Sequence, residues 1–348
     1  MKKLRICYLP FSENYEAPGD RRRLVFWAKL SGHELTSNLK EKCDLIVLSE
    51  KANFRDPLIK KNGAPVILDL IDGYLSPKSL NEDILRGLAK KLDRQVSGPW
   101  MRFSKNIEVI ARAANAVICS SIEQKNVITP FNSNTHVILD SHSEIPFQSF
   151  RKRTDFIKHL SLFWEGLPYT AYGLRRINPT LVELNKKYKT ELNCVTDVEY
   201  HRILGKYWTM STQKSLNKKL KISSSRINVF PWSVTNLCLI SAISHLALLP
   251  LNTEIPMQRL KPENRLLIMW RLGLPCVTSD SPAYIRLSNQ ITHSFTCSTT
   301  DEWLKNILRY TSVDLAESQV SQGQDYIREY HSDEVLLGKW NSAIASVL

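Results

Sequence analysis

At 348 residues the chain is longer than one ordinary domain, so its length predicts about two domains. The apolar content of 43% is that of a globular protein, and the longest apolar run, at residues 237–251, is too short and too polar to span a bilayer. A formal net charge of +13 favours a polyanionic partner; because the basic residues are dispersed and not interleaved with aromatic side chains, we expect an anionic membrane surface or an acidic substrate and no nucleic acid.

The first half of the chain alternates apolar strands with helices. Its N-terminal apolar stretch is short and is broken by Pro10, which favours a first strand over a secretion signal. A helix at 21–31 is expected to end at Gly32, and a helical stretch at 79–114 is interrupted near Gly98. Strands separated by helices imply a parallel sheet with both faces covered. The predicted strands lie at 4–9, 43–49, 65–70, 116–120 and 136–139, with a short helix at 121–128.

A proline and a basic run at 143–158 interrupt this alternation, and we place the domain linker there. The same pattern then restarts, which predicts an α/β protein with two tandem Rossmann-like parallel-sheet domains that face a central cleft. The expected bounds are 1–150 and 151–325, followed at 326–348 by a C-terminal helix that can cross back to the first domain. In the second domain strands are expected at 160–164, 192–195, 227–230, 246–251, 275–279 and 293–297, helices at 174–188, 236–244, 262–273, 300–310 and from 316, and a loop at 280–284.

The stretch from 246 to 280 is expected to form a strand, a helix and a second strand, joined as a right-handed βαβ unit. Pro262 suits the first turn of this helix and Gly273 its end. Parallel sheets bind ligands beyond the carboxyl ends of their strands, where a helix N-terminus offers unpaired N–H groups and a partial positive charge. Lys261, Asn264 and Arg265 fall there, which predicts a phosphate or diphosphate site; a solvated helix start is the alternative interpretation.

Several stretches, in this order, resemble the GT-B fold glycosyltransferases, in the group that includes glycogen-synthase-like enzymes. The resemblance covers most of the chain. It implies a transferase that moves a sugar from a nucleotide-sugar donor to a glycan or lipid-linked acceptor, as in bacterial surface polysaccharide biosynthesis. The net charge of +13 and the scattered cysteines further lead us to expect a cytoplasmic protein that can sit peripherally on the inner face of the membrane. The stretches are NAVICSS (115–121), HVILDSH (136–142), LFWEGLP (162–168), VFPWS (229–233), HLALLPL (245–251), KPENRLLIMWRLGLPCVTSDSPAY (261–284) and DYIREYHSDEVLLGKW (325–340).

The resemblance also implies roles for residues on the donor side. Arg265, with Lys261 as a second cation, would hold the donor diphosphate and stabilise the leaving nucleotide. The loop with Trp232 and Ser233 would hold the nucleobase, although a Trp232 that is simply buried in the core is the competing interpretation. Glu165 and Gly166 would form a loop that approaches the diphosphate.

On the acceptor side the resemblance singles out the loop that opens the first helix. Gly19 and Arg21 would shape the acceptor side there, and Asp20 is a candidate catalytic residue in contact with the acceptor. The following Arg22 and Arg23 are expected to be solvated. Asp72 could act as a base on an acceptor hydroxyl, or it could merely form a turn before Gly73. His142 is a further candidate base, with a structural histidine as the alternative.

One position departs from the family pattern. Many retaining members carry a Glu-x7-Glu signature whose second glutamate binds the donor ribose, and Ile268 stands at that position here. Glu263 could substitute one turn earlier, whereas the same spacing at Glu183 and Glu191 falls in the wrong place. The departure leaves retaining and inverting reactions open, and also a catalytically inactive scaffold subunit. A dinucleotide enzyme is disfavoured because no Gly-x-Gly-x-x-Gly follows a predicted strand.

No cofactor or metal is expected. The sequence has no Asp-x-Asp motif and no cluster of residues with metal-ligand spacing. Its seven cysteines are odd in number and far apart, which is typical of reduced thiols in the core of a cytosolic protein.

Overall fold

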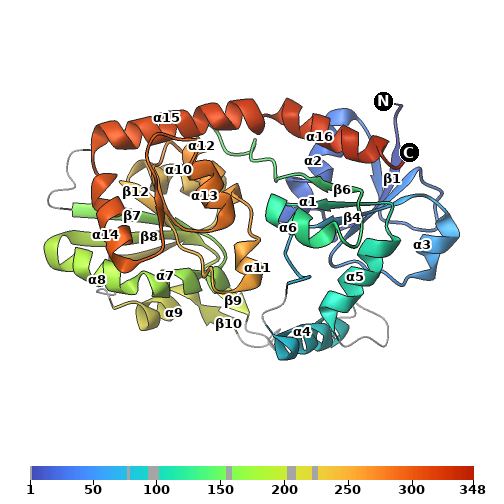
Figure 1. Cartoon of the computed structure of the whole chain (residues 1–348), viewed down its shortest axis with the longest axis horizontal. Coiled ribbons are helices and arrows are strands. Elements are labelled where there is room, and N and C mark those ends of the chain that lie inside the picture. The colour runs from blue at the N-terminus through green and yellow to red at the C-terminus, as the bar shows by residue number, and fades with distance from the viewer. Residues whose placement is uncertain (1, 77–78, 93–101, 154–158, 202–208, 222–225) are drawn as a thin grey trace. The chain divides into compact units, whose positions relative to one another are not determined.

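The structure is a computed structural model of the chain, and it describes residues 2–76, 79–92, 102–153, 159–201, 209–221 and 226–348 (Figure 1). Its contacts define two compact units. Unit 1 comprises Met1–Ser141, Ile255–Pro262 and Glu329–Leu348, and unit 2 comprises His142–Glu254 and Glu263–Arg328. The predicted break at Gly98 and Pro99, and the end of the predicted linker at 154–158, lie outside the described residues.

Unit 1 contains a six-stranded sheet in the order β2-β1-β3-β4-β5-β6, and each neighbouring pair is parallel. Five of its strands were expected from apolar runs. The additional edge strand, β2, has only three residues, none of them fully buried, so it lacks the apolar run that predicts a strand. The strands are β1 (Arg5–Leu9), β2 (Glu34–Thr36), β3 (Leu45–Ser49), β4 (Val66–Leu70), β5 (Ala116–Cys119) and β6 (Thr135–Val137).

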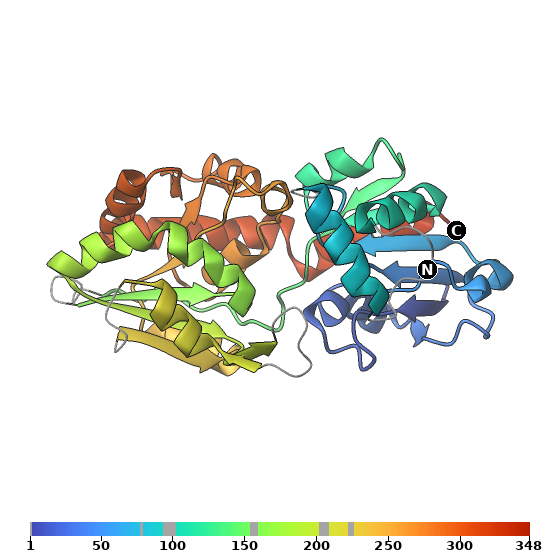
Figure 2. The ribbon, with the colours of Figure 1, turned by 90° about the horizontal axis from the view of Figure 1, so that it is seen from below.

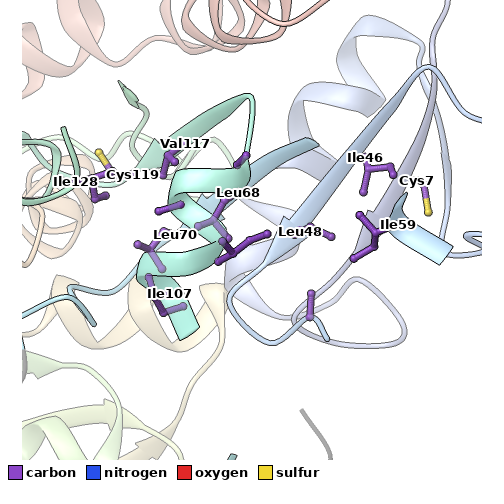
Figure 3. Close-up of a cluster of buried hydrophobic side chains, with 14 of the residues drawn as sticks. Cys7, Ile46, Leu48, Ile59, Leu68, Leu70, Ile107, Val117, Cys119 and Ile128 are labelled. Carbon is purple, nitrogen blue, oxygen red and sulfur yellow. The ribbon is translucent and has the colours of Figure 1, made fainter. Parts of the chain in front are cut away.

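The strands of unit 1 are apolar throughout because both faces of the sheet are covered. In β3, Leu45 and Val47 face one core while Ile46 and Leu48 face the other. The first core packs against α2 (Leu24–Ser31) and α16 (Asp333–Ala345). Figure 3 shows the second core, where side chains of β4 and β5 gather with Ile107 and Ile128. The helices that carry them are α5 (Phe103–Ala113) and α6 (Ile122–Ile128), and unit 1 also contains α1 (Pro18–Arg21), α3 (Pro57–Asn62), α4 (Leu80–Leu92) and α11 (Pro256–Arg259).

Unit 2 contains a second six-stranded parallel sheet, in the order β11-β8-β7-β12-β13-β14. The helices lie on both faces of this sheet, with α8 and α9 on one side and α10 and α12 on the other (Figures 1 and 2). The sheet strands are β7 (His159–Glu165), β8 (Lys189–Thr196), β11 (Ile227–Pro231), β12 (Leu246–Leu249), β13 (Cys276–Ser279) and β14 (Thr296–Cys297), with a small antiparallel pair of β9 (Glu199–His201) and β10 (Thr209–Ser211).

The helices of unit 2 depart from expectation at several places, and α9 was not expected at all. The stretch expected as one helix at 174–188 is divided, because Pro179 starts a new helix. The loop expected at 280–284 is instead the start of α13, which Ser281 caps and Pro282 opens. The helix expected from Pro262 begins at Asn264. The elements are η2 (Pro168–Ala171), α7 (Tyr172–Arg176), α8 (Asn178–Lys187), α9 (Thr212–Lys219), α10 (Val234–Ala242), α12 (Asn264–Arg271), α13 (Pro282–Ser288), α14 (Thr300–Arg309) and α15 (Val313–Tyr330), the last of which runs on into unit 1.

All seven cysteines are free, and only Cys238 is partly exposed, which agrees with the core thiols expected from the sequence. None of the helices in the described part of the chain combines the length and apolar character that crossing a membrane requires.

Gly273 ends α12 as the sequence predicts. Its backbone is left-handed, with φ of 68°, and the N–H groups of Gly273 and Leu274 donate to the carbonyls of Trp270 and Met269, which is a Schellman motif. A Cβ at this position would lie 2.6 Å from the carbonyl oxygen of Ser149 and 2.7 Å from that of Gln148. These are backbone atoms of the segment that leads into β7, so they cannot move aside as a flexible side chain would.

We therefore expect Gly273→Ala to lower the stability of the protein by more than the ~1–2 kcal/mol that the left-handed backbone alone costs. Gly32 is a matched control, because it ends α2 with φ of 72° and a Cβ there would meet nothing within 4 Å. The measurement is urea-induced unfolding of both variants. Equal losses would show that the contact with residues 148 and 149 carries no cost.

Candidate active site

The carboxyl ends of the strands in unit 2 bring polar side chains to one edge of its sheet. Glu165 ends β7 and Thr196 ends β8, while Trp232 directly follows β11. In this sheet β8 pairs with one side of β7 and β12 pairs with the other. The direction in which successive strands are added therefore reverses between β7 and β12, which is the switch point of the sheet. Ligands of open α/β sheets bind at such a point. Here α12 begins beyond it, with Arg265 in its first turn.

Arg265 lies between an aromatic ring and a carboxylate. Its Cζ is 5.6 Å from the centre of the Trp164 ring, and its Nε is 3.7 Å from Glu165 Oε2. Both Nε and Nη2 are buried and have no hydrogen-bond partner among the described residues. Because buried guanidinium N–H groups are nearly always paired, the two nitrogens are available to donate to a bound ligand.

Four further buried polar atoms at this edge have no hydrogen-bond partner in the described part of the chain. Each would cost about 1–3 kcal/mol if it stayed unpaired, so several together at the end of one sheet indicate a polar ligand. Asn264 precedes Arg265 in the chain, and the Trp164 ring lies beside its guanidinium. The four atoms are Trp164 Nε1, Glu165 Oε2, Thr196 Oγ1 and Asn264 Oδ1.

The N-terminus of α12 adds a fixed positive field to these side chains. The helix has eight residues and no side chain caps its start. The N–H groups of Leu266 and Leu267 donate to the Glu263 carbonyl, at 2.8 Å and 3.2 Å. The start of the helix carries a partial positive charge, and the side chain of Arg265 adds a full one. This combination suits an anion such as a phosphate.

Glu165 is held by the loop expected to bind a nucleobase. Its Oε1 accepts a hydrogen bond from Trp232 Nε1 at 3.1 Å. The adjacent Gly166 has φ of 154°, and a Cβ there would lie 3.1 Å from the Trp164 ring. Ser233 uses its hydroxyl to cap α10, accepting from Asn236 N at 3.0 Å. Trp232, which the sequence places either at the nucleobase or in the core, is partly exposed and donates its hydrogen bond to Glu165.

Glu263 and Tyr284 complete the surroundings of Arg265. Glu263 is buried at the start of α12, and its Oε2 lies 3.4 Å from Arg286 Nη2. Burial raises the pKa of Tyr284 to about 12; the charge of Arg265 opposes this rise, while Glu263 and Glu165 add to it. The phenol therefore remains protonated near neutral pH.

Sequence reasoning did not find Trp164, Thr196 or Tyr284. Trp164 and Thr196 could have been found from their positions in the chain, because each lies at or next to the carboxyl end of a strand, where ligands of parallel sheets bind. Tyr284 lies in the segment expected as a loop, and its burial depends on α13.

In unit 1 the structure brings Asp72 and Lys261 together. Lys261 Nζ lies 2.5 Å from Asp72 Oδ1, and Gln124 Nε2 donates to the Asp72 carbonyl at 3.0 Å. Glu50, a buried carboxylate that the sequence did not single out, accepts from the Tyr74 hydroxyl and from the Asp72 N–H. The base expected at Asp72 and the second phosphate cation expected at Lys261 thus form one ion pair, and both roles remain predictions.

The loop expected to face an acceptor is held by Asp20 from inside. Asp20 is fully buried, and its oxygens accept from the Tyr8 hydroxyl at 2.6 Å, from the Phe11 N–H, and from the N–H and hydroxyl of Ser12. This fourfold bonding gives Asp20 a structural role in the loop, and its role on the acceptor side remains a prediction. Gly19 packs between Phe11 and Ile71, and Arg21 donates to the Glu16 carbonyl.

The expectation that Arg22 and Arg23 are solvated is wrong. Both are buried, and Arg23 is fully inaccessible. The Arg23 guanidinium pairs with Asp69 at 2.5 Å, with Asp140 at 3.2 Å and with the Ile138 carbonyl at 2.7 Å. Burial alone would lower the pKa of Arg23, but the two carboxylates outweigh it and raise the pKa above its usual range.

His142 is buried, with only 6% of its surface exposed. It directly follows unit 1 in the chain, and its carbonyl accepts from Ile145 N at 2.9 Å. Its role as a base remains a prediction. Within the described ranges, no group of three or more His, Cys, Asp or Glu side chains is arranged to hold a metal ion.

Comparisons with known proteins agree in fold although not in sequence. No known protein-family pattern matches the chain, and no curated protein matches it in sequence. Among solved structures, HepE from Anabaena, in complex with UDP-glucose, is similar with a TM-score of 0.61 at 12% identity, over 99% of this chain and 100% of that one. WaaG, a glycosyltransferase involved in lipopolysaccharide biosynthesis, gives a TM-score of 0.52 at 12% identity, over 97% and 98% of the two chains.

TarM is also similar, with a TM-score of 0.56 at 14% identity over 86% of this chain, which spans about half of the TarM chain (54%). These neighbours, together with two parallel six-stranded sheets covered by helices, define the fold class. The chain has the GT-B fold of glycosyltransferases, as the resemblance of its motifs implies.

Proposed function

We propose that this chain is a glycosyltransferase that moves a sugar from a nucleotide-sugar donor to a glycan or lipid-linked acceptor. The observation that carries the proposal is a group of buried atoms on Arg265, Asn264 and Glu165, near the N-terminus of α12, that have no hydrogen-bond partner among the residues that the structure describes. In a chain with the GT-B fold, this group offers donors and positive charge for a diphosphate and an acceptor for hydroxyl groups.

In this proposal Arg265 and the first N–H groups of α12 bind the donor diphosphate. Negative charge builds on the leaving nucleoside diphosphate as the bond to the sugar breaks. Fixed donors aimed at that charge stabilise the transition state more than the ground state. The partly exposed indole of Trp232 stacks on the nucleobase, and no metal is required because the guanidinium and the helix supply the positive charge.

The pathway and the cellular location are proposed from the structural neighbours and from the net charge. A solved structure of a TarM mutant from S. aureus contains UDP, and WaaG is involved in lipopolysaccharide biosynthesis. A role in bacterial surface polysaccharide assembly at the cytoplasmic face of a membrane fits these neighbours and the net charge of +13. Helix α4 adds exposed apolar side chains that could meet a lipid surface, at Leu80, Leu85 and Leu88.

A catalytically inactive scaffold subunit is the second candidate. Ile268 occupies the position where the resemblance implies a ribose-binding glutamate, and its side chain is buried in the core with only 2% exposed. A scaffold of this kind would bind a nucleotide without turning over a donor.

A panel of UDP-, GDP- and TDP-sugars tests the proposal. We expect at least one donor to release its nucleoside diphosphate in the presence of an acceptor such as a lipid-linked glycan, at a rate that EDTA does not lower. UDP-glucose is tried first because HepE was solved with it. Binding of UDP without turnover of any donor would favour the scaffold, and stabilisation by NAD alone would favour a dinucleotide enzyme.

A further inference from the structure

The two oxygens of Glu165 have different surroundings. Oε1 accepts a hydrogen bond from the indole N–H of Trp232 at 3.1 Å. Oε2 is buried and has no hydrogen-bond partner in the part of the chain that the structure describes, and it lies 3.7 Å from Arg265 Nε, beyond hydrogen-bonding distance. The carboxylate is thus fixed on one side and presents an unused acceptor on the other.

The group that fills this acceptor must be a hydrogen-bond donor that lies close to the phosphate site. A phosphate cannot fill it, because phosphate oxygens are acceptors and carry like charge. In a nucleotide sugar the diphosphate has a ribose on one side and the transferred sugar on the other, and the nucleobase lies beyond the ribose. The nearest donors to a diphosphate on Arg265 are therefore ring hydroxyl groups.

We propose that Glu165 Oε2 accepts a hydrogen bond from a ring hydroxyl of the donor, on the ribose or on the transferred sugar, and so makes the site selective for hydroxylated donors. This inference rests on the proposed function. It assigns Glu165 to the sugar part of the ligand, whereas the resemblance of its loop implies an approach to the diphosphate.

Trp232 makes Glu165→Gln an unusually specific test. The indole N–H needs an acceptor, so it holds the amide oxygen of the new glutamine on its own side and turns the NH2 group toward the ligand. The substitution then replaces an acceptor by a donor at the position of Oε2, with almost no change in shape. In the double variant Glu165→Gln, Trp232→Phe the amide is released and can turn its oxygen back to the ligand.

Binding of three probes by calorimetry separates the possible roles of Glu165. Pyrophosphate reports the phosphate site alone, UDP adds the ribose and the uracil, and UDP-glucose adds the transferred sugar. Removing a carboxylate beside Arg265 should leave pyrophosphate binding unchanged or strengthen it. We expect Glu165→Gln to lower binding affinity by about tenfold to a hundredfold, because that is the strength of a hydrogen bond to a charged group. The loss should affect either both UDP and UDP-glucose, or UDP-glucose alone.

The two patterns identify the source of the hydroxyl. Weaker binding of both UDP and UDP-glucose points to the ribose. In that case the wild type should bind 2′- or 3′-deoxy UDP more weakly than UDP by the same factor, whereas Glu165→Gln should bind the two nucleotides equally well. Weaker binding of UDP-glucose alone points to the transferred sugar. In either case the double variant should recover part of the loss. Glu254→Gln is the matched control, because that carboxylate is exposed and also pairs with an arginine.

Other results would overturn the inference. If Glu165→Gln weakens pyrophosphate as much as UDP, Glu165 only orients Arg265 and contacts no hydroxyl. If none of the probes loses affinity, Oε2 is not used by the ligand; both results leave the proposed glycosyltransferase standing. If the wild type binds neither UDP nor any nucleotide sugar, the inference and the proposed function fail together.

Discussion

Replacing Arg265 by glutamine is expected to reduce sugar transfer by about 100-fold to 1,000-fold, the loss typical when a fixed donor to a developing negative charge is removed. The side chain has two buried N–H positions without partners among the described residues and lies in the first turn of α12. Because this charge is greatest in the transition state, most of the loss should appear in kcat. The measurement is steady-state transfer with the donor that the panel identifies.

Arg265→Lys is expected to keep part of the activity, since it keeps the charge but loses the planar fork of donors. Arg259→Gln removes an equally charged but exposed arginine and should leave transfer unchanged. Unfolding without nucleotide checks the fold of Arg265→Gln. Its unfolding midpoint has to lie well above the assay temperature, because the substitution also removes the cation 3.7 Å from the buried Glu165 carboxylate. Full activity in Arg265→Gln would remove this residue from the mechanism.

Replacing Arg23 by methionine is expected to destabilise the protein by about 3–5 kcal/mol, the cost of leaving a buried charge without its partner. Arg23 and Asp69 are both fully buried, and the guanidinium donates to Asp69 through Nε and Nη2. The measurement is urea-induced unfolding at neutral pH. An apolar pair, Arg23→Met with Asp69→Leu, should recover most of the loss because no buried charge remains at Asp69.

The loss in Arg23→Met should also depend on pH in a defined direction. Without the guanidinium, burial raises the pKa of Asp69 in the folded state above its value in the unfolded chain. The folded state then binds more protons than the unfolded state, so stability falls as the pH rises above about 4. A loss that is the same at pH 4 and pH 7 would show that Asp69 keeps its charge without Arg23.

The sheets were predictable because both of their faces are buried. Strands such as β3, β5 and β12 are short apolar runs, and such runs can be recognised without information from the rest of the chain. Helix ends at Gly32 and Gly273 were predictable for the same reason, since the left-handed backbone there is a local property. The edge strand β2 and the helix α13 were missed because their residues carry no periodic apolar pattern of sufficient length.

The candidate site was predictable only where it depends on position along the chain. Arg265 and Asn264 were found because a helix start after a buried strand is a local feature. Arg23 was misjudged because its environment is set by residues far away in sequence, such as Asp69 and Asp140. A run of three arginines looks like a solvated surface, and only the folded structure shows that two of them, Arg22 and Arg23, are buried.

The most direct test of the account is a crystal structure of the protein with UDP. We expect the β-phosphate within about 3.2 Å of Arg265 Nη2 and of an N–H group in the first turn of α12. A nucleotide bound at another place, with Arg265 Nη2 still lacking a hydrogen-bond partner, would contradict the proposed donor site.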